Sequence, residues 1–453
     1  MPGEDSQIED SGIGDSGIEE SGVEMTGPAV VLESRYDVTT LAAESVAQAT
    51  MAVADLLAAR TGEPRRAVRV DRIAACAAFA GERLFAPDGW QLPPAWDPIA
   101  GDYRTGDGWI RLHTNYAHHR AAVLRALDLP ADCDSRDEIG AAVVLRGAND
   151  IEAAVVAQGG PAAALHDTAS WFDLPAGRAA REQGLWEAPA PRWTVTLAPA
   201  DRPLEGVRVL DLTRVIAGPV ATRFLAAYGA DVLRIDPPGF AEVPALLPEV
   251  TPGKHCAAMD LRLEADRARF LGLVRYAHVL VGGFRDGALQ GLGFGPGRLR
   301  QENPGLIIAR MNAYGWDGPW SGRRGFDSLV QMSTGIAYLD ADSAPSPLPV
   351  QALDHATGYL LAAAVCRALT GLVLTGVPTD VRTSLVATAN LLLDLPAPAV
   401  RADDFSWPAE VFESVDTEWG PAQQVRVPGT IEGVAPSYPV PAGRLGRHEP
   451  SFS

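Results

Sequence analysis

Apolar residues recur at two spacings along this chain, and together they predict a mixed α/β protein. Helical spacing covers residues 41–57, 73–84, 117–127, 137–145, 151–158, 220–228, 263–276 and 360–374. Short apolar runs at 68–70, 207–212, 231–235, 279–281 and 306–312 predict strands. The order strand, helix, strand between 207 and 235 is a βαβ unit. Such units build Rossmann-like parallel sheets, with ligands at the carboxyl ends of the strands.

One carboxylate stands out from this pattern. The turn Gly325-Phe326-Asp327 is followed by Asp354, which opens the apolar run 360–374. Aspartate ahead of an apolar helix is commonly an N-cap, so the pattern alone favours a structural role. The free N–H groups and the dipole of a helix N-terminus also hold a carboxylate ionised, and hence available as a nucleophile. Adjacent residues at a helix start project in different directions, so the neighbouring His355 does not point the same way as Asp354. We therefore expect His355 to be a structural or exposed histidine.

Composition shifts divide the chain into five segments. Residues 1–28 carry eight acidic residues and no Lys or Arg, and they predict a disordered acidic tail. A small-domain half is expected over 29–186, and a Pro-rich linker over 187–203. A Rossmann-like domain that carries Asp354 is expected over 204–397. The prolines beyond it predict an extended C-terminal arm over 398–453.

Charge and cysteine content exclude several classes of protein. The net charge of −19 falls to −11 without the eight acids of the tail, and no basic stripe suits nucleic acid. No run of about 18 uncharged apolar residues indicates a membrane span. The four cysteines lack CxxC spacing, so we expect a cytoplasmic protein without disulfides or a zinc site. The loop after strand 207–212 lacks GxGxxG, so no nicotinamide cofactor is predicted.

The second half of the chain resembles a known family. The segments that carry the resemblance are LEGVRVLDLTRVIAGP (204–219), GADVLRID (229–236), NPGLI (303–307), YGWDGP (314–319), GFD (325–327) and residues 354–385. They are similar to the family III coenzyme A transferases, also called CaiB/BaiF. That family includes formyl-CoA transferase, carnitine CoA-transferases and α-methylacyl-CoA racemase.

The resemblance implies an α/β fold with a smaller α+β domain, and an enzyme that moves CoA between an acyl-CoA and a carboxylic acid. It implies that Asp354 is the nucleophile, that no metal or redox cofactor is required, and that the chain forms a homodimer. The CoA contacts that it implies are Arg214, Ile216, Ala217, Lys254, Arg285, Tyr314, Gly315, Phe326 and Asp327. A glycine-rich turn at 158–160 is a candidate for stabilising oxyanions.

Departures from the family keep two alternatives open. The racemase branch has a histidine where this chain has Phe326, so an acyl-CoA racemase or isomerase is the second interpretation. Pro237 and Gly283 replace residues that family members often carry near CoA, which motivates a non-catalytic CoA-binding relative as the third. The segment order is also rearranged. Residues 43–84 are loosely similar to the helical region that follows Asp354, and the position that matches Asp354 falls near Thr40.

Overall fold

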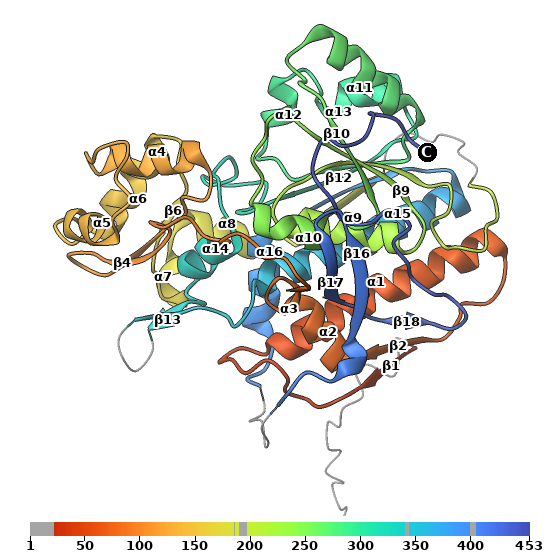
Figure 1. Cartoon of the computed structure of the whole chain (residues 1–453), viewed down its shortest axis with the longest axis horizontal. Helices are drawn as coiled ribbons and strands as arrows, with labels where there is room; N and C mark the ends of the chain where they lie inside the picture. The colour runs from red at the N-terminus through yellow and green to blue at the C-terminus, as the bar shows by residue number, and fades with distance from the viewer. Residues whose placement is uncertain (1–21, 185, 190–196, 340–343, 399–404) are drawn as a thin grey trace, which may run out of the picture.

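The computed structural model describes residues 22–184, 186–189, 197–339, 344–398 and 405–453. A large domain is built around a parallel sheet, and a smaller domain of helices and short strands projects from one side of it (Figure 1). This arrangement confirms the predicted α/β class, with a Rossmann-like sheet and a smaller α+β domain.

The central sheet has six parallel strands and one antiparallel edge strand. Its order is β10 (Lys254–Ala258), β9 (Asp231–Asp236), β8 (Arg208–Leu212), β11 (Val279–Gly282), β12 (Ile307–Asn312), β15 (Thr379–Ser384) and β7 (Trp186–Pro189). From β8 the chain builds outward to β9 and β10, and it then returns to place β11 on the other side of β8. The crevice between β8 and β11 is therefore the topological switch point, where open α/β sheets bind ligands.

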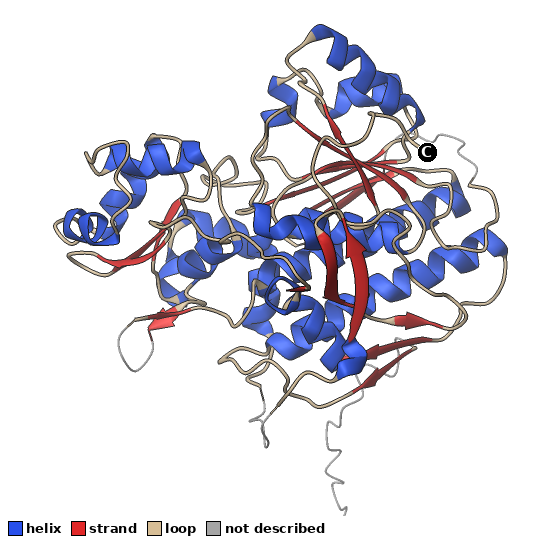
Figure 2. Ribbon diagram, viewed as in Figure 1, coloured by secondary structure: helices blue, strands red, loops and turns tan. Residues whose placement is uncertain are grey.

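Both faces of the sheet are buried, as a parallel sheet requires (Figure 2). Alternate residues of β8 belong to different cores: Val209 joins the core under α9 (Ala217–Ala227) and α15 (Ala352–Thr375). Leu210 joins the core under α11 (Glu264–Tyr276) and α13 (Pro296–Glu302). Near-continuous apolar runs such as 207–212 follow from this burial on two sides.

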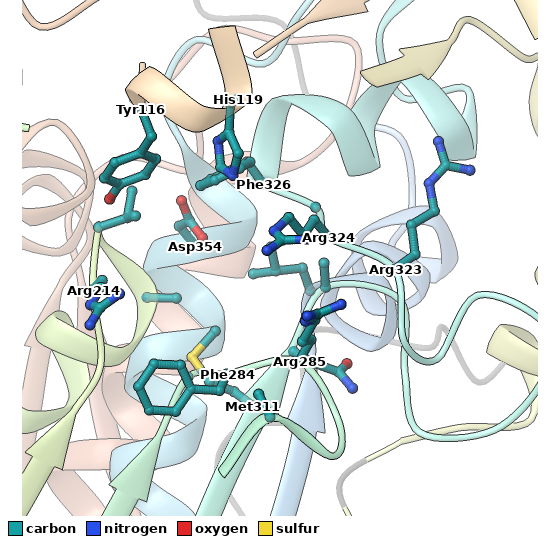
Figure 3. Close-up of a pocket in the computed structure, with 18 of the residues that line it drawn as sticks. Tyr116, His119, Arg214, Phe284, Arg285, Met311, Arg323, Arg324, Phe326 and Asp354 are labelled. Atoms are coloured by element: carbon teal, nitrogen blue, oxygen red, sulfur yellow. The ribbon is translucent and has the colours of Figure 1, made fainter. Parts of the chain in front are cut away.

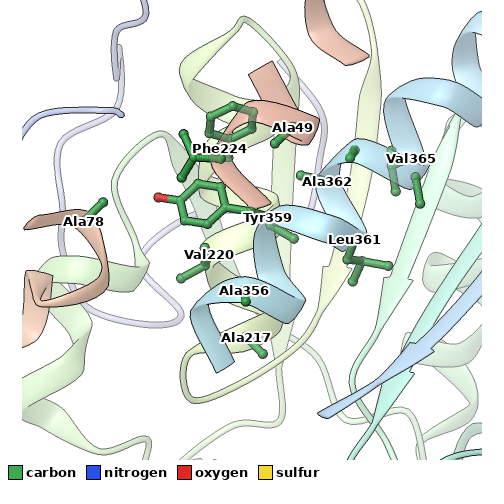
Figure 4. Close-up of a cluster of buried hydrophobic side chains, with 14 of the residues drawn as sticks. Ala49, Ala78, Ala217, Val220, Phe224, Ala356, Tyr359, Leu361, Ala362 and Val365 are labelled. Carbon is green, nitrogen blue, oxygen red and sulfur yellow. The ribbon is translucent and has the colours of Figure 1, made fainter. Parts of the chain in front are cut away.

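Two matching helices lie at the centre of the large domain. Helices α1 (Val38–Thr61) and α15 each have 24 residues and end at a left-handed glycine, and they pack against each other. Tyr359 of α15 is surrounded by α1 and α9 side chains (Figure 4). Both helices are long and apolar enough to cross a membrane, but 72% and 67% of their apolar windows are buried inside the protein. Thr40 and Asp354 are each the third residue of their helix, so the pairing predicted from sequence holds in the structure.

The small domain has a core of its own. A sheet of β4 (Gly101–Arg104), β5 (Trp109–Leu112) and β6 (Ala162–Ala164) packs against α4 (Ala117–Ala126), α5 (Arg136–Val143) and α6 (Ala148–Ala157). Helices α7 (Thr168–Asp173), α8 (Pro175–Arg181) and α14 (Asp327–Thr334) connect this domain to the large one.

The first half of the chain is divided between the two domains. Helices α1, α2 (Arg72–Phe79) and α3 (Gly81–Leu84) belong to the large domain, although the sequence placed them in the small-domain half. Their apolar residues pack in the core around α15. The disordered tail predicted over 1–28 is too long, because β1 (Val23–Thr26) within it pairs with β2 (Val68–Asp71). Residues 1–21 of the tail lie outside the described residues. The predicted linker begins too early, because β7 pairs with β15 up to Pro189.

The C-terminal segment follows α16 (Leu385–Asp394) and covers the large domain. A hairpin of β16 (Phe412–Thr417) and β17 (Gly420–Val425) pairs with β3 (Ala86–Pro87), and β18 (Thr430–Ile431) pairs with β2. Beyond them, His448 bonds to the backbone of edge strand β10. The remaining short elements are η2 (Pro244–Leu246), α10 (Leu247–Val250), α12 (Ala288–Gly291), β13 (Tyr338–Leu339), β14 (Pro345–Ser346) and η3 (Ala409–Val411).

Candidate active site

Two cavities meet at Asp354, in the crevice between the domains. The first has a volume of about 350 Å³ and is lined by the loops that follow β8, β11 and β12 and by α4 of the small domain. We call it the arginine cavity, after Arg214, Arg285, Arg323 and Arg324 in its wall. The second has a volume of about 230 Å³ and mostly apolar walls, and we call it the apolar cavity. Tyr116, Val215, Phe326 and Asp354 line both.

Asp354 is the third residue of α15, and its side chain faces the arginine cavity (Figure 3). The residue is 6% exposed. It is not the N-cap expected from the sequence, because the helix begins after Gln351. Burial raises the pKa of the Asp354 carboxyl well above its usual range, and the nearby Asp327 and Glu82 raise it further. The expectation that the helix end keeps this carboxylate ionised is therefore not supported, because burial and two acidic neighbours oppose ionisation.

Asp327 supplies the cap that α15 lacks. It is fully buried at the start of α14, and its Oδ2 accepts a hydrogen bond of 2.9 Å from the backbone N–H of Asp354. Its other oxygen accepts a hydrogen bond from the Gln331 side chain. Burial raises the pKa of Asp327 to about 6. Asp327 lines neither cavity and holds the start of α15 instead, so the expected contact between Asp327 and CoA is not supported.

Phe326, Ile216 and Ala217 line the two cavities. Phe326 lines both cavities and stacks on His113 of the small domain, with ring centroids 3.7 Å apart. Ala217, the first residue of α9, lines the arginine cavity, and Ile216 lines the apolar cavity. Between Arg214 and Ile216, Val215 has a φ of 65°, a left-handed conformation that is costly for a β-branched residue. The loop after β8 lines both cavities.

Three arginines give the arginine cavity its charge. Arg214 is half-buried and lies 3.8 Å from the ring centroid of Phe240, and its Nε is 3.4 Å from Asp236. Arg285 and Arg324 form no ion pair with a carboxylate among the residues that the structure describes. Burial lowers the pKa of Arg324, and the positive charge of Arg285 lowers it further. Two neighbouring guanidinium groups without a counterion favour an anionic ligand such as a phosphate.

Arg323 also borders the cavity but points away from its centre (Figure 3). Its guanidinium bonds to Glu152 at 2.9 Å and to the carbonyl oxygen of Ala162 at 2.6 Å, so it connects α14's leading loop to the small domain. The adjacent basic pair 323–324 ahead of the GFD turn was visible in the sequence, but only the structure separates their roles.

Lys254, Tyr314 and Gly315 lie outside both cavities. Lys254 is fully buried, and its Nζ bonds to Asp211 at 3.0 Å, to Thr222 at 2.7 Å and to a backbone carbonyl. Burial lowers the pKa of Lys254 to about 8. The Tyr314 hydroxyl is 3.1 Å from Ser333 in the core, and Gly315 closes a turn by donating to Asn312. Direct contact of these three residues with CoA is therefore not supported: they form the platform beneath the site.

The small domain contributes Tyr116, His118 and His119, which the sequence gave no reason to select. The Tyr116 hydroxyl donates a 2.6 Å hydrogen bond to Glu242 of the large domain, which also pairs with buried Arg234. Burial lowers the pKa of His119 to about 2, with His118 and His113 adding to the effect. The ring of His119 that faces Asp354 is therefore neutral at physiological pH (Figure 3).

The predicted oxyanion turn at 158–160 lies at the end of α6 and lines neither cavity. Gly160 is needed for packing, because a Cβ there would lie 2.8 Å from Ala122 and 2.9 Å from Val155. Gly159 has a φ of 77°, and a Cβ on it would lie 4.0 Å from the Arg324 guanidinium. The turn therefore supports the wall behind Arg324.

His355 beside Asp354 is structural, as expected. Its Nε2 bonds to Glu82 of α3 at 2.8 Å, and its ring stacks on Phe79 with centroids 5.2 Å apart. Burial disfavours the ionised form of Glu82, but the attraction and hydrogen bond of His355 lower the pKa of Glu82 below its ordinary value. Segments about 270 residues apart in the chain thus meet beside the nucleophile candidate.

Comparison with known proteins finds a family that matches the second half of the chain. Residues 204–422 match the model of CoA-transferase family III. A probable fatty acyl-CoA transferase, Rv3272 of Mycobacterium tuberculosis, is 37% identical over 183 residues, which are 37% of this chain and 46% of the relative. Acetyl-coenzyme A transferase nodX of Hypoxylon pulicicidum is 30% identical over 298 residues, 60% of this chain and 50% of the relative. The chain thus spans about half the length of the curated relatives it matches.

Among solved structures, a CaiB/BaiF family protein from Brucella suis aligns with a TM-score of 0.40 and 24% identity, covering 49% of this chain and 65% of that one. The sequence match over 204–422 includes Asp354, the arginine-bearing loops and the strands that carry them. With the Rossmann-like sheet and this crevice in place, residues 204–422, just under half of the chain, are similar to CoA-transferase family III.

Proposed function

We propose that this protein transfers coenzyme A between an acyl-CoA thioester and a carboxylic acid, with Asp354 as the nucleophile. The observation that carries the proposal is the position of Asp354. Its carboxyl lies where a cavity with two unpaired guanidinium groups meets an apolar cavity, within the family III domain. Relatives named acetyl-CoA:oxalate CoA-transferase, from Acetobacter aceti, and succinyl-CoA–L-malate CoA-transferase alpha subunit, from Chloroflexus aurantiacus, support this class of reaction.

The proposed reaction proceeds through two covalent forms of Asp354. The carboxylate attacks the thioester carbonyl, which releases CoA thiolate and leaves a mixed anhydride. The thiolate then attacks the aspartyl carbonyl, which forms an aspartyl-CoA thioester and releases the donor acid. The acceptor carboxylate attacks that thioester, which releases CoA thiolate and leaves a second mixed anhydride. The thiolate finally attacks the acceptor's acyl carbon in this anhydride, which gives the new acyl-CoA and frees the Asp354 carboxylate. No metal or redox cofactor takes part in this scheme.

The charges around Asp354 suit these steps. Arg285 and Arg324 would bind phosphate oxygens of CoA, which replaces the repulsion between two cations with charge-assisted hydrogen bonds. The raised pKa of Asp354 makes its carboxylate, once ionised, a stronger nucleophile than an ordinary aspartate. We place the reaction in the cytoplasm, where the four buried, free cysteines would stay reduced, and in a homodimer.

A racemase or isomerase is the second candidate, because His119 faces the cavity that Asp354 lines. Proton transfer at the α-carbon needs an acid and a base with pKa values near the working pH. The pKa of His119 is lowered to about 2 and Phe326 cannot exchange a proton, so the site favours transfer over racemisation. Exchange of the α-proton for deuterium, without transfer to a second acid, would identify the alternative.

The test measures identity exchange, which needs no knowledge of the natural acceptor. Purified protein is incubated with an acyl-CoA and the matching ¹⁴C-labelled acid, and the label that enters the thioester is measured. Hydroxylamine then traps the activated aspartate, and mass spectrometry locates it. We expect exchange, a hydroxamate at Asp354, and loss of both in Asp354→Asn.

Asp37→Asn is the matched control, because Asp37 caps the start of the paired helix α1 and asparagine also caps. This variant should exchange label at the wild-type rate. Absence of exchange and of any adduct across acetyl-, butyryl- and succinyl-CoA would leave the non-catalytic CoA-binding protein as the better description.

A further inference from the structure

The apolar cavity lies against Asp354, and neither Arg285 nor Arg324 lines it. Its walls come from segments far apart in the chain: α2, the loop at 95–96, the segment before η2, and residues 348–351. Its apolar wall residues include Phe79, Trp96, Val243, Leu246, Leu348 and Val350. A volume of about 230 Å³ equals that of roughly eight water molecules, so the cavity has room for an acyl group of several carbons.

The position of Asp354 orients a thioester between the two cavities. The cationic groups that would hold the CoA phosphates, Arg285 and Arg324, border only the arginine cavity. A thioester carbonyl at Asp354 then has its sulfur on the arginine side. The acyl carbons on the other side of the carbonyl extend past Phe326 and Val215 into the apolar cavity, because both residues line the two spaces.

The charged groups along the apolar cavity disfavour a second carboxylate. Glu82 lies in the wall and is ionised at neutral pH, since its hydrogen bond with His355 lowers its pKa. Burial lowers the pKa of His113 to about 3, so that imidazole is neutral. Arg83 is exposed at the rim, and its guanidinium bonds to the carbonyl oxygen of Pro349 at 2.6 Å. A carboxylate placed inside would therefore lose its hydration beside the Glu82–His355 pair, and Arg83, the cation among the described wall residues, is exposed and already bonded to Pro349.

We propose that the apolar cavity is the acyl subsite, and that it selects the acyl group of an apolar monocarboxylic acid over that of a dicarboxylic acid. The assignment rests on the proposed CoA transfer at Asp354. Apolar wall contact stabilises a methyl terminus, whereas a terminal carboxylate would lose its hydration beside Glu82.

The test compares two acyl groups of equal length that differ at one end. Butyryl-CoA with labelled butyrate, and succinyl-CoA with labelled succinate, are measured in the identity-exchange assay with the full chain. We expect kcat/KM for the butyryl pair to exceed that for the succinyl pair by about tenfold or more. Burying a carboxylate without a partner weakens binding by about tenfold or more. In Glu82→Gln, which keeps a hydrogen-bonding side chain toward His355, the ratio should narrow through faster succinyl exchange.

A second variant tests the cavity by volume. Leu348→Trp fills the space, and it should slow exchange of butyryl-CoA while sparing acetyl-CoA, whose acyl group ends near Asp354. Inhibition by free CoA, which does not use the acyl subsite, reports whether the variant is folded and binds at the arginine cavity. An equal loss for acetyl- and butyryl-CoA, or a wild-type preference for succinyl-CoA, overturns the acyl assignment and leaves CoA transfer intact. Absence of exchange with every thioester overturns both.

Discussion

Lys254 and Arg285 offer a direct test of the site, because the resemblance assigns both to CoA while the structure separates them. Lys254 is fully buried and bonds to Asp211 at 3.0 Å, whereas Arg285 is exposed in the arginine cavity. Replacing Lys254 with methionine keeps most of the volume but leaves the Asp211 carboxylate buried without its cation. Breaking a buried pair in this way costs about 3–5 kcal/mol.

The expected shift in melting temperature follows from the chain length. At about 2.1 cal/mol/K per residue, 453 residues give an unfolding entropy near 0.95 kcal/mol/K. A loss of 3–5 kcal/mol therefore lowers Tm by about 3–5 °C when the chain unfolds as one unit. Calorimetry or fluorescence thermal scans measure this shift. Lys254→Met should leave the KM for acyl-CoA within about twofold of wild type when it is assayed well below Tm.

Arg285→Met should show the opposite behaviour. An exposed substitution changes stability by about 0.5 kcal/mol or less. Loss of a charge-assisted hydrogen bond to phosphate costs about 1.5–3 kcal/mol, which raises KM roughly tenfold to a hundredfold. The double variant Asp211→Asn/Lys254→Met removes both buried charges and should recover much of the stability lost in Lys254→Met. An unchanged Tm together with a raised KM in Lys254→Met would refute the structural assignment.

Three further predictions concern the helix that carries Asp354. In Asp327→Asn the loss of a neighbouring negative charge should lower the pKa of Asp354, so the acid limb of the kcat/KM profile moves to lower pH; a limb that stays in place contradicts this coupling. Because the pKa of Asp354 is raised in the folded protein, this residue costs stability at neutral pH; the cost shrinks as pH falls below the raised pKa and is gone below the ordinary pKa of an aspartate. Asp354→Asn should therefore raise Tm at pH 7, by an amount that shrinks toward pH 5, and a difference independent of pH would argue against it. Gly358→Ala places a Cβ 2.5 Å from the Ala217 carbonyl oxygen, and it should lower stability by about 1–3 kcal/mol and reduce exchange activity with it. Gly371→Ala is the control: no atom lies within 4 Å of its Cβ, so it should lower neither stability nor activity.

Much of the fold was predictable because it depends on local pattern. The predicted strands 207–212, 231–235, 279–281 and 306–312 correspond to β8, β9, β11 and β12 within one or two residues. Burial of both faces makes such strands apolar throughout, which is visible in the sequence. Strand β15 was not predicted, because TDVRTS is mostly polar, and only pairing with β12 and packing under α15 make it a strand.

The candidate site was predictable where one motif positions a residue by itself. Asp354, Arg214, Arg285 and Phe326, which the sequence singled out, border the arginine cavity, since each lies near a strand or helix end that faces the switch point. Sequence reasoning missed Arg324, His119 and Glu82. No local pattern assigns their roles, because these roles depend on the docking of the small domain and the packing of α3 on the large one.

The sequence by itself determined the parallel sheet, the helix that begins near Asp354, and the matching helix in which Thr40 takes the place of the acid. These features depend on the spacing of apolar residues and on the residues at helix ends, which are local in the sequence. Tertiary structure alone decided which charged groups are buried, and hence their chemistry. It placed Lys254 in the core with Asp211, made Asp327 the cap of another helix, and set Glu82 beside Asp354 to raise its pKa. These outcomes depend on desolvation and on partners distant in sequence, which only the packed chain brings together.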